Sequence, residues 1–419
     1  MKFVWFLFCV SVWCLKIPDD LIDLTIQRQW VKSNKHALHA CVAIDSQVRY
    51  YNDDLIVNIV GFCDDFFRNE PVYCEISSFY GSVERQNATV FRAPPNETRG
   101  GYRSPLFLAP SQFGDVLMWN AIYVNCGSVG PEFGTVTIVS GETRIENVVF
   151  EALPTDSEPT VTSAICTRLY NINQWKPANT IRLLEWIEWN LAIGIDVIHV
   201  YLHSVRSDQL WEVLRAYIDA NKIVLHDWSN DAVMHGWELS QVSHITDCLL
   251  RLEGNVKYIT HMDHDEYIQL SSNFTNISEA LSHIIAKEKV LSNVLRVDPL
   301  MVKAQACSKT VEEPHVASYC SGCEYSYFSW SKYFFVSDRD QPLQLMPYIH
   351  TASGGRAPYN VSRDYAFLAH IKGSLERNAE CSNPIYIQWD SETALKTWKS
   401  LTTRPIVEEL YKSSEIRTI

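Results

Sequence analysis

The chain has 419 residues, of which 47% are hydrophobic and 20% are charged, and its formal net charge at pH 7 is -13. This length favours two domains, and the composition is typical of a folded globular protein and excludes a disordered one. The acidic charge argues against nucleic acid as a partner, since nucleic-acid binding requires a basic face. A small basic pocket for a phosphorylated ligand remains compatible with that charge.

The N-terminus starts with Met1 and Lys2 and continues as an apolar run from Phe3 to Leu15. The run is short for a bilayer-spanning helix and matches the hydrophobic region of a signal peptide. A short type II membrane anchor is the alternative. Residues 1–16 are therefore expected to direct the chain into the secretory pathway, either as a cleaved signal or as an anchor.

Glycosylation sequons and cysteines agree with that route. Five Asn-x-Ser/Thr sequons follow the leader, at Asn87, Asn96, Asn273, Asn276 and Asn360. The cysteines after the leader are even in number, which suits disulfide bonds in an oxidising lumen: Cys41, Cys63, Cys74, Cys126, Cys166, Cys248, Cys307, Cys320, Cys323 and Cys381. The C-x-x-C motif at 320–323 lacks a second metal-binding pair, so a disulfide is favoured there over zinc.

Residues 17–155 contain short β-prone runs separated by glycine, proline, asparagine and aspartate, which predicts a β-rich N-terminal lumenal region. The clearest runs are 55–60, 72–76, 116–119 and 134–139. This region shows no catalytic constellation. Residues 153–159, with their prolines and acids, are expected to form the linker to the next domain.

After residue 160, strands alternate with amphipathic helices. Strands are predicted over 162–169, 196–202, 223–226 and from 256 onwards, and the helices between them end at Gly194, Asn221 and Gly254. Such alternation predicts a Rossmann-like α/β domain with a mostly parallel sheet over residues 160–400. The sequence lacks both G-x-G-x-x-G and the P-loop motif, so phosphate must be held in another way.

The fourth strand leads into Asp263, Asp265 and Glu266, three carboxylates within four residues. Carboxylates so close repel one another, and a hard divalent cation with oxygen ligands would relieve that repulsion. The carboxyl end of a strand in an α/β sheet is also where such sheets bind ligands. Alternatively, one aspartate caps a following helix and the other acids are solvated.

An ordered set of segments resembles glycosyltransferase family 92. They are 184–190, 194–196, 200–204, 241–248, 258–268, 330–334 and 346–350, so that the likeness covers roughly residues 160–372. The resemblance implies a GT-A catalytic domain, a UDP-sugar donor (UDP-galactose in characterised members), Mn²⁺ dependence and inverting transfer to a glycan.

The resemblance also assigns roles to individual residues. Asp263 and Asp265 match the Asp-x-Asp motif that binds the metal and the donor, and Glu266 matches the acid that follows it. His350 falls where a C-terminal histidine completes the metal site, with His370 as its rival. The sequence departs from the family at His261 and His264, which bring imidazoles to the strand end, and in its leader, which is shorter than the usual Golgi anchor.

Inverting transfer needs a general base to take the proton of the acceptor hydroxyl. The candidates are Glu312, Glu313 and Glu324, and each alternatively is a solvated loop acid.

Four further residues carry two interpretations each. Arg168 contacts the uridine or a phosphate, or is a surface arginine. Lys332 holds a phosphate or is solvated. Asp247 faces the donor, or pairs with Arg251 four residues later on one helix. Trp330 stacks on an acceptor sugar or belongs to the core.

The leading prediction is thus a lumenal, Mn²⁺-dependent galactosyltransferase in the Golgi that acts on a glycan of a glycoprotein or glycolipid. A secreted relative that binds a glycan or another partner without turnover is the alternative. A glycoside hydrolase fits less well, because the carboxylates are adjacent in sequence and better placed to bind one ion.

Overall fold

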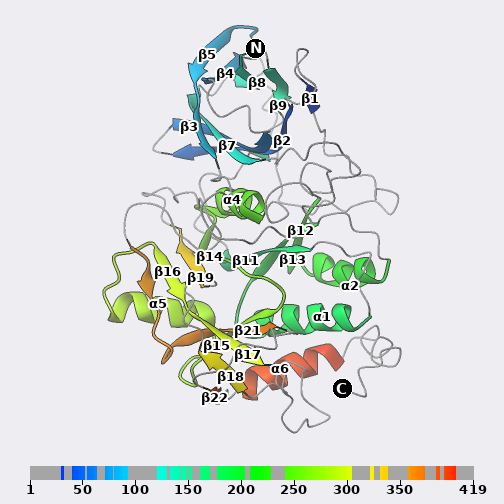
Figure 1. Cartoon of the computed structure of the whole chain (residues 1–419), viewed down its shortest axis with the longest axis vertical. Coiled ribbons are helices and arrows are strands. Elements are labelled where there is room, and N and C mark those ends of the chain that lie inside the picture. Colours follow the sequence, from blue (N-terminus) through cyan, green and yellow to red (C-terminus); the bar gives the residue numbers. More distant parts are fainter. Residues whose placement is uncertain are drawn as a thin grey trace, which may run out of the picture.

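The computed structural model describes residues 30–32, 40–51, 54–63, 71–78, 80–92, 120–129, 133–141, 143–148, 151–152, 161–169, 177–202, 208–227, 241–303, 321–324, 331–337, 357–372, 384–386 and 391–402. Figure 1 shows an all-strand part above an α/β part. Helix α4 (Gln241–Leu252) lies between them and contacts strands of the upper part. The predicted leader lies outside the described residues, among which no helix is long and apolar enough to cross a membrane.

The described residues before 153 form strands in two sheets. The six-stranded sheet has the order β1-β2-β3-β7-β6, with β10 beside β2: β1 (Trp30–Lys32), β2 (Ala40–Tyr51), β3 (Asp54–Cys63), β6 (Thr89–Arg92), β7 (Asn120–Val129) and β10 (Glu151–Ala152). The four-stranded sheet has the order β5-β4-β8-β9: β4 (Val72–Ser78), β5 (Val83–Asn87), β8 (Phe133–Ser140) and β9 (Thr143–Val148).

Three of the predicted β-prone runs fall within β3, β4 and β8, and the run 116–119 lies outside the described residues. Burial alternates along β4, where Val72, Cys74 and Ile76 are buried and the residues between them are more exposed, as expected for a strand with one face in a core. A disulfide joins Cys74 to Cys126 of β7 and so links the two sheets.

The central α/β sheet contains the four strands that the sequence predicts. They are β11 (Val161–Leu169), β12 (Val197–Leu202), β13 (Ile223–Asp227) and β14 (Val256–His261), all parallel, in the order β13-β12-β11-β14. The crossovers contain α1 (Pro177–Ala192), α2 (Asp208–Asp219) and α4. Gly194, Asn221 and Gly254, where the helices were expected to end, all have positive φ angles.

The sheet continues past β14 with a mixed set of strands. β19 (Lys332–Val336) pairs antiparallel with β14, β16 (Val294–Val297) antiparallel with β19, and β20 (Tyr359–Asn360) parallel with β16. The predicted α/β class is therefore confirmed, and the predicted parallel strands form one part of a sheet that is mixed as a whole, with β19 antiparallel to both β14 and β16.

A second mixed sheet lies below the central sheet in Figure 1, with the order β15-β21-β17-β18-β22. It contains β15 (Glu266–Leu270), β17 (Pro299–Lys303), β18 (Ser321–Glu324), β21 (Ala366–Lys372) and β22 (Pro384–Tyr386). Helices α5 (Ile277–Lys287) and α6 (Ser391–Thr402) complete the described part, and α6 packs on α1.

Helix α1 holds this second sheet in place through two buried tryptophans. The indole nitrogen of Trp186 donates a hydrogen bond to the carbonyl oxygen of Glu266 at 2.8 Å, and that of Trp189 donates to the carbonyl oxygen of Ile268 at 2.9 Å. Both side chains are fully buried, so these bonds lie in the core. They fix the start of β15, which is the strand that follows the acidic motif.

Candidate active site

The acidic motif lies where the order of the central strands changes direction. From β11 the chain crosses to β12 on one side, and β14 later joins β11 on the other side. In open α/β sheets, ligands bind outside the carboxyl ends of the strands at such a switch point. The backbone amide of Met262 donates to the carbonyl oxygen of Cys166 at 3.1 Å, so Asp263 emerges at the carboxyl ends of both strands.

The motif forms a tight turn between β14 and β15, closed by Glu266. The amide of Asp263 donates to a carboxylate oxygen of Glu266 at 2.9 Å, and the amide of Glu266 donates to the carbonyl oxygen of Asp263 at 3.1 Å. The side chain of Glu266 is only 1% exposed. Glu266 therefore supports the turn from inside, whereas Asp263 and Asp265 reach the surface, with side chains 32% and 41% exposed.

Lys332 at the start of β19 is the buried counter-ion of this turn. Its ammonium nitrogen lies 3.0 Å from Oδ2 of Asp263 and 3.1 Å from Oε2 of Glu266, and its side chain is 3% exposed. The interpretation of Lys332 as a solvated lysine is therefore wrong. Burial alone would lower the pKa of Lys332, but the charges of Asp263 and Glu266 outweigh burial and raise it, so the ammonium stays charged.

The pKa values of Asp263 and Glu266 shift in opposite directions. Burial alone would raise the pKa of Asp263, but the positive charges of Lys332, His261 and Arg168 hold it well below its ordinary value. Burial dominates at Glu266 and raises its pKa to about 7, although Lys332 opposes that shift. Asp263 is thus ionised at neutral pH, while Glu266 gains or loses its proton near neutral pH.

His370 of β21 approaches the same turn from the second sheet. It lies opposite Glu266 in the strand register. Its Nε2 atom is 3.4 Å from Oδ2 of Asp265, and its Nδ1 atom is 3.8 Å from Oε1 of Glu266. Burial would lower the pKa of His370, but its bond to Asp265 and the charge of Glu266 raise it. Of the two histidines named as metal ligands, His370 thus lies at the motif, and His350 lies outside the described residues.

The donor atoms in this turn suit a hard divalent cation. Asp263 and Asp265 place carboxylate oxygens at the surface, and such cations are often held by one or two carboxylates together with phosphate oxygens of a substrate. Across the described ranges, the structure contains no group of three His, Cys, Asp or Glu side chains arranged to hold a metal ion. The two aspartates would supply two of the oxygen ligands of such an ion.

Arg168, the penultimate residue of β11, is 8% exposed, so the interpretation of it as a surface arginine is wrong. Its charge contributes to the low pKa of Asp263. Arg168 and Lys332 thus place two positive charges beside the acidic motif.

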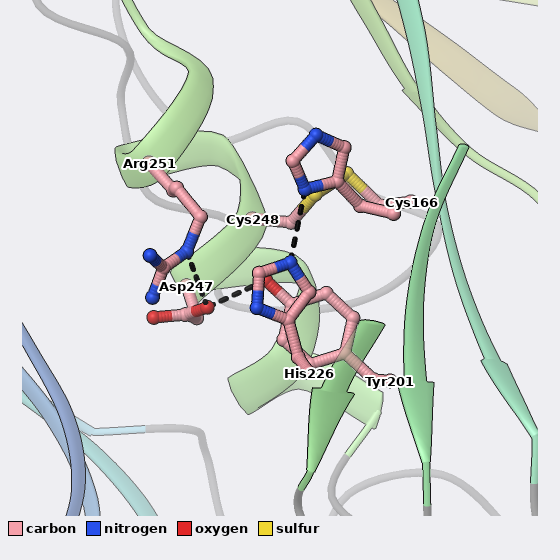
Figure 2. The surroundings of a disulfide bond; sticks show 7 residues. Cys166, Tyr201, His226, Asp247, Cys248 and Arg251 are labelled. Carbon is pink, nitrogen blue, oxygen red and sulfur yellow. Dashed lines mark hydrogen bonds and ion pairs between the residues drawn. A yellow bond between two sulfur atoms is a disulfide. The ribbon is translucent and has the colours of Figure 1, made fainter. Parts of the chain in front are cut away.

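Asp247 belongs to the neighbouring core rather than to the motif. Tyr201 donates a hydrogen bond of 2.5 Å to Asp247, and Nε of Arg251 lies 3.5 Å from the same carboxylate, which confirms the predicted pairing of helix neighbours (Figure 2). Asp247 and Arg251 lie on α4, beside the disulfide that joins Cys166 of β11 to Cys248 of α4.

A ring cluster that the sequence analysis missed surrounds these residues. We define it as His199, Tyr201, His226 and His244. Nδ1 of His199 and Nε2 of His226 are 2.9 Å apart, and the ring of Tyr201 stacks on His226 with centroids 4.4 Å apart. Burial, followed by the charge of Arg251, lowers the pKa of His199 to about 3 and also lowers that of His226. The three histidines lie singly on β12, β13 and α4, so no spacing in the sequence indicated this cluster.

The remaining predicted residues are not brought to the site by the described part of the structure. Glu312, Glu313 and Trp330 lie outside it. Glu324 is the last residue of β18, whose backbone places it opposite Leu300 in the second sheet. The role of the three glutamates as candidate bases stays a prediction.

Comparison with known proteins agrees with this site. Residues 162–340 match the model of glycosyltransferase family 92. A beta-1,4-galactosyltransferase of Caenorhabditis elegans, galt-1, is 36% identical over 88 residues, which are 20% of this chain and 21% of that protein. The galactan beta-1,4-galactosyltransferases GALS3 and GALS2 of Arabidopsis thaliana are 26% and 27% identical over 91 and 89 residues, 21% of this chain and 18% and 17% of theirs.

The alignments thus span about a fifth of the length of these relatives. Among solved structures, a 4-diphosphocytidyl-2C-methyl-D-erythritol synthase from Anaerococcus prevotii aligns with 58% of this chain and 99% of its own at 10% identity, but its TM-score of 0.23 does not establish a shared fold. The resemblance to glycosyltransferase family 92 is confirmed over residues 162–340, the segment that contains Asp263, Asp265 and Lys332.

Proposed function

We propose that this protein is a metal-dependent glycosyltransferase with a GT-A catalytic domain, which transfers galactose from UDP-galactose to a glycan with inversion. The observation that carries the proposal is the position of Asp263 and Asp265. They emerge at the carboxyl end of β14, at the switch point of the sheet, within the segment that matches family 92.

Asp263 and Asp265 would hold a divalent cation, with Mn²⁺ expected, between themselves and the diphosphate of the donor. Such an ion stabilises the negative charge that develops on the departing diphosphate. Lys332 holds the carboxylate of Asp263, Glu266 accepts a hydrogen bond from the backbone amide of Asp263, and His370 holds the carboxylate of Asp265. Arg168 adds positive charge on the β11 side of the motif, where a phosphate or the uridine would lie.

The choice of galactose is supported by the printed names of the three relatives, each of which is a beta-1,4-galactosyltransferase. The acceptor is proposed to be a glycan of a glycoprotein or glycolipid, and Glu312, Glu313 and Glu324 remain the candidate bases. A lumenal location is supported by two disulfides of the described residues, Cys74–Cys126 and Cys166–Cys248, because disulfides persist in oxidising compartments. Within the secretory pathway the Golgi is proposed from the resemblance to family 92.

A transfer assay tests this function. The purified protein is incubated with Mn²⁺, a panel of UDP-hexoses and β-galactoside-terminated acceptors, and the products are analysed by mass spectrometry and linkage analysis. We expect galactose transfer by the wild type, loss of it in Asp263→Asn, and retention in Asp219→Asn, a matched change at an exposed position of α2. Metal-dependent UDP binding without transfer to any glycan would instead support the non-catalytic binding protein.

A further inference from the structure

Two sequons lie three residues apart in the segment Asn273-Phe274-Thr275-Asn276-Ile277-Ser278, just before and within the start of α5. Both match the acceptor pattern for N-linked glycans. Their asparagines, however, have different surroundings in the fold. The structure therefore distinguishes two sites that the sequence alone treats as equivalent.

Asn276 is the N-cap of α5. Its side-chain oxygen accepts hydrogen bonds from the backbone amides of Ser278 at 2.8 Å and Glu279 at 3.2 Å. Its φ and ψ of -136° and 130° are the extended values typical of an N-cap. Two of the amide groups that the first turn of a helix leaves without intrahelical partners are satisfied in this way.

The nitrogen of the same side chain faces the end of α1. A Cβ atom placed on Gly194 would lie 2.2 Å from Nδ2 of Asn276, so the amide nitrogen packs directly against that glycine. The backbone there is also tied down, because the amide of Ile277 donates to the carbonyl oxygen of Ile193 at 2.8 Å. An N-linked glycan is attached through Nδ2, and no oligosaccharide fits into this contact.

Asn273 is in the opposite situation. It is exposed, in the turn that follows β15, and Thr275 of its sequon is exposed as well. Phe274 between them is partly buried, with its ring centroid 5.2 Å from that of His283, so the turn is anchored by the aromatic side chain. Asn273 is therefore exposed on an anchored turn, where a bulky group would meet solvent.

We propose that Asn273 carries an N-linked glycan in the folded protein and that Asn276 does not, because the side chain of Asn276 is used to cap α5 against Gly194. This assignment rests on the proposed passage through the secretory pathway and is independent of the transferase activity. The donor is the lipid-linked oligosaccharide of that pathway, and the bond formed joins Nδ2 of Asn273 to the first sugar, with loss of the amide proton and of the lipid diphosphate.

The experiment removes each sequon without touching either asparagine. Thr275→Ala abolishes the first sequon, and Ser278→Ala abolishes the second while keeping both Asn276 and the backbone amide that it caps. The full chain is expressed in glycosylating cells behind a secretion signal of the host, so that the native leader is not under test. Glycans are counted by glycopeptide mass spectrometry and by the gel shift on treatment with peptide N-glycosidase.

We expect Thr275→Ala to lose one glycan relative to the wild type and Ser278→Ala to lose none. A glycan on Asn276 in secreted, folded protein, or an unmodified Asn273, would overturn the proposal. Asn276→Asp and Asn276→Gln provide a second readout: aspartate preserves the cap and should leave the melting temperature nearly unchanged, whereas glutamine should lower it. Equal melting temperatures for these two variants would contradict the capping role. None of these readouts depends on transfer activity, so their failure is distinguishable from failure of the proposed function.

Discussion

The ammonium group of Lys332 lies 3.0 Å from the carboxylate of Asp263, although 69 residues separate the two in the sequence. The pair is brought together because β19 inserts antiparallel next to β14. Lys332 also binds Glu266, so one buried cation holds two of the three acids of the motif. The acidic turn is consequently a preformed structure with its own internal counter-ion.

Replacement of Lys332 is predicted to destabilise the protein. Lys332→Met leaves the buried carboxylate of Glu266 without its cation, and breaking a buried ion pair from one side costs about 3–5 kcal/mol. The loss of stability is measured as the change in the free energy of unfolding in urea. Lys222→Met, at an exposed lysine, is the control and should change stability little. Adding Glu266→Gln to Lys332→Met should recover part of the loss, and purely additive losses would contradict the pairing.

His370 is predicted to act on ligand binding rather than on stability. His370→Ala removes the partner that orients Asp265, and loss of a group that orients a metal ligand typically lowers metal affinity about 10–100-fold. Isothermal titration of UDP in the presence of Mn²⁺ measures the effect. His283→Ala, an exposed histidine of α5, is the control. Unchanged affinity in His370→Ala would show that Asp265 needs no such support.

The ring cluster predicts that stability falls in acid. The pKa of His199 is lowered to about 3 and that of His226 is also lowered, whereas both titrate near 6.5 when the chain is unfolded. Below that pH the unfolded state binds more protons than the folded state, so protons favour unfolding.

Each of these two histidines then costs up to about 1.4 kcal/mol per pH unit, and stability is highest above the unfolded pKa. Arg251, Asp247, Tyr201 and His244 lie around these rings. Burial, followed by the charge of Arg251, causes the shift. Urea unfolding between pH 7.5 and pH 5 should show a steep slope in the wild type and a shallower slope in His226→Gln. Equal slopes would rule out this origin of acid sensitivity.

Gly194 is predicted to be intolerant of a side chain. Its φ is +92°, which disfavours other residues by roughly 1–2 kcal/mol, and a Cβ atom there would lie 2.2 Å from Asn276. Gly254 is the matched control, with a φ of +78° and nothing within 4 Å of a Cβ atom. We expect Gly194→Ala to lose clearly more stability than Gly254→Ala. Equal losses would mean that the contact with Asn276 adds nothing.

The local features of the α/β domain were predictable from the sequence, and the contacts between distant segments were not. Helical periodicity, together with Gly194 and Gly254 at the ends of helices, predicted the parallel strands and their crossovers. The apolar run ending at His261 placed the acidic motif at a strand end. The burial of Lys332 depends on β19 entering the sheet beside β14. The approach of His370 to the acidic motif depends on the second sheet, whose strand pairing no local sequence pattern predicts.

The ring cluster was missed for a similar reason. His199 and His226 lie on neighbouring parallel strands, and their separation of 27 residues carries no periodicity. Asp247 and Arg251 were paired correctly because they are neighbours on one helix, where four-residue spacing fixes their distance.

The proposed donor site is tested most directly by thermal unfolding of the wild type and of Asp265→Asn with UDP, in the presence and absence of Mn²⁺. We expect UDP to raise the melting temperature of the wild type only when Mn²⁺ is present. Asp265→Asn should lose this stabilisation while melting normally without ligand. Absence of any response of the well-folded wild type to UDP, at every Mn²⁺ concentration, would contradict the proposed donor site.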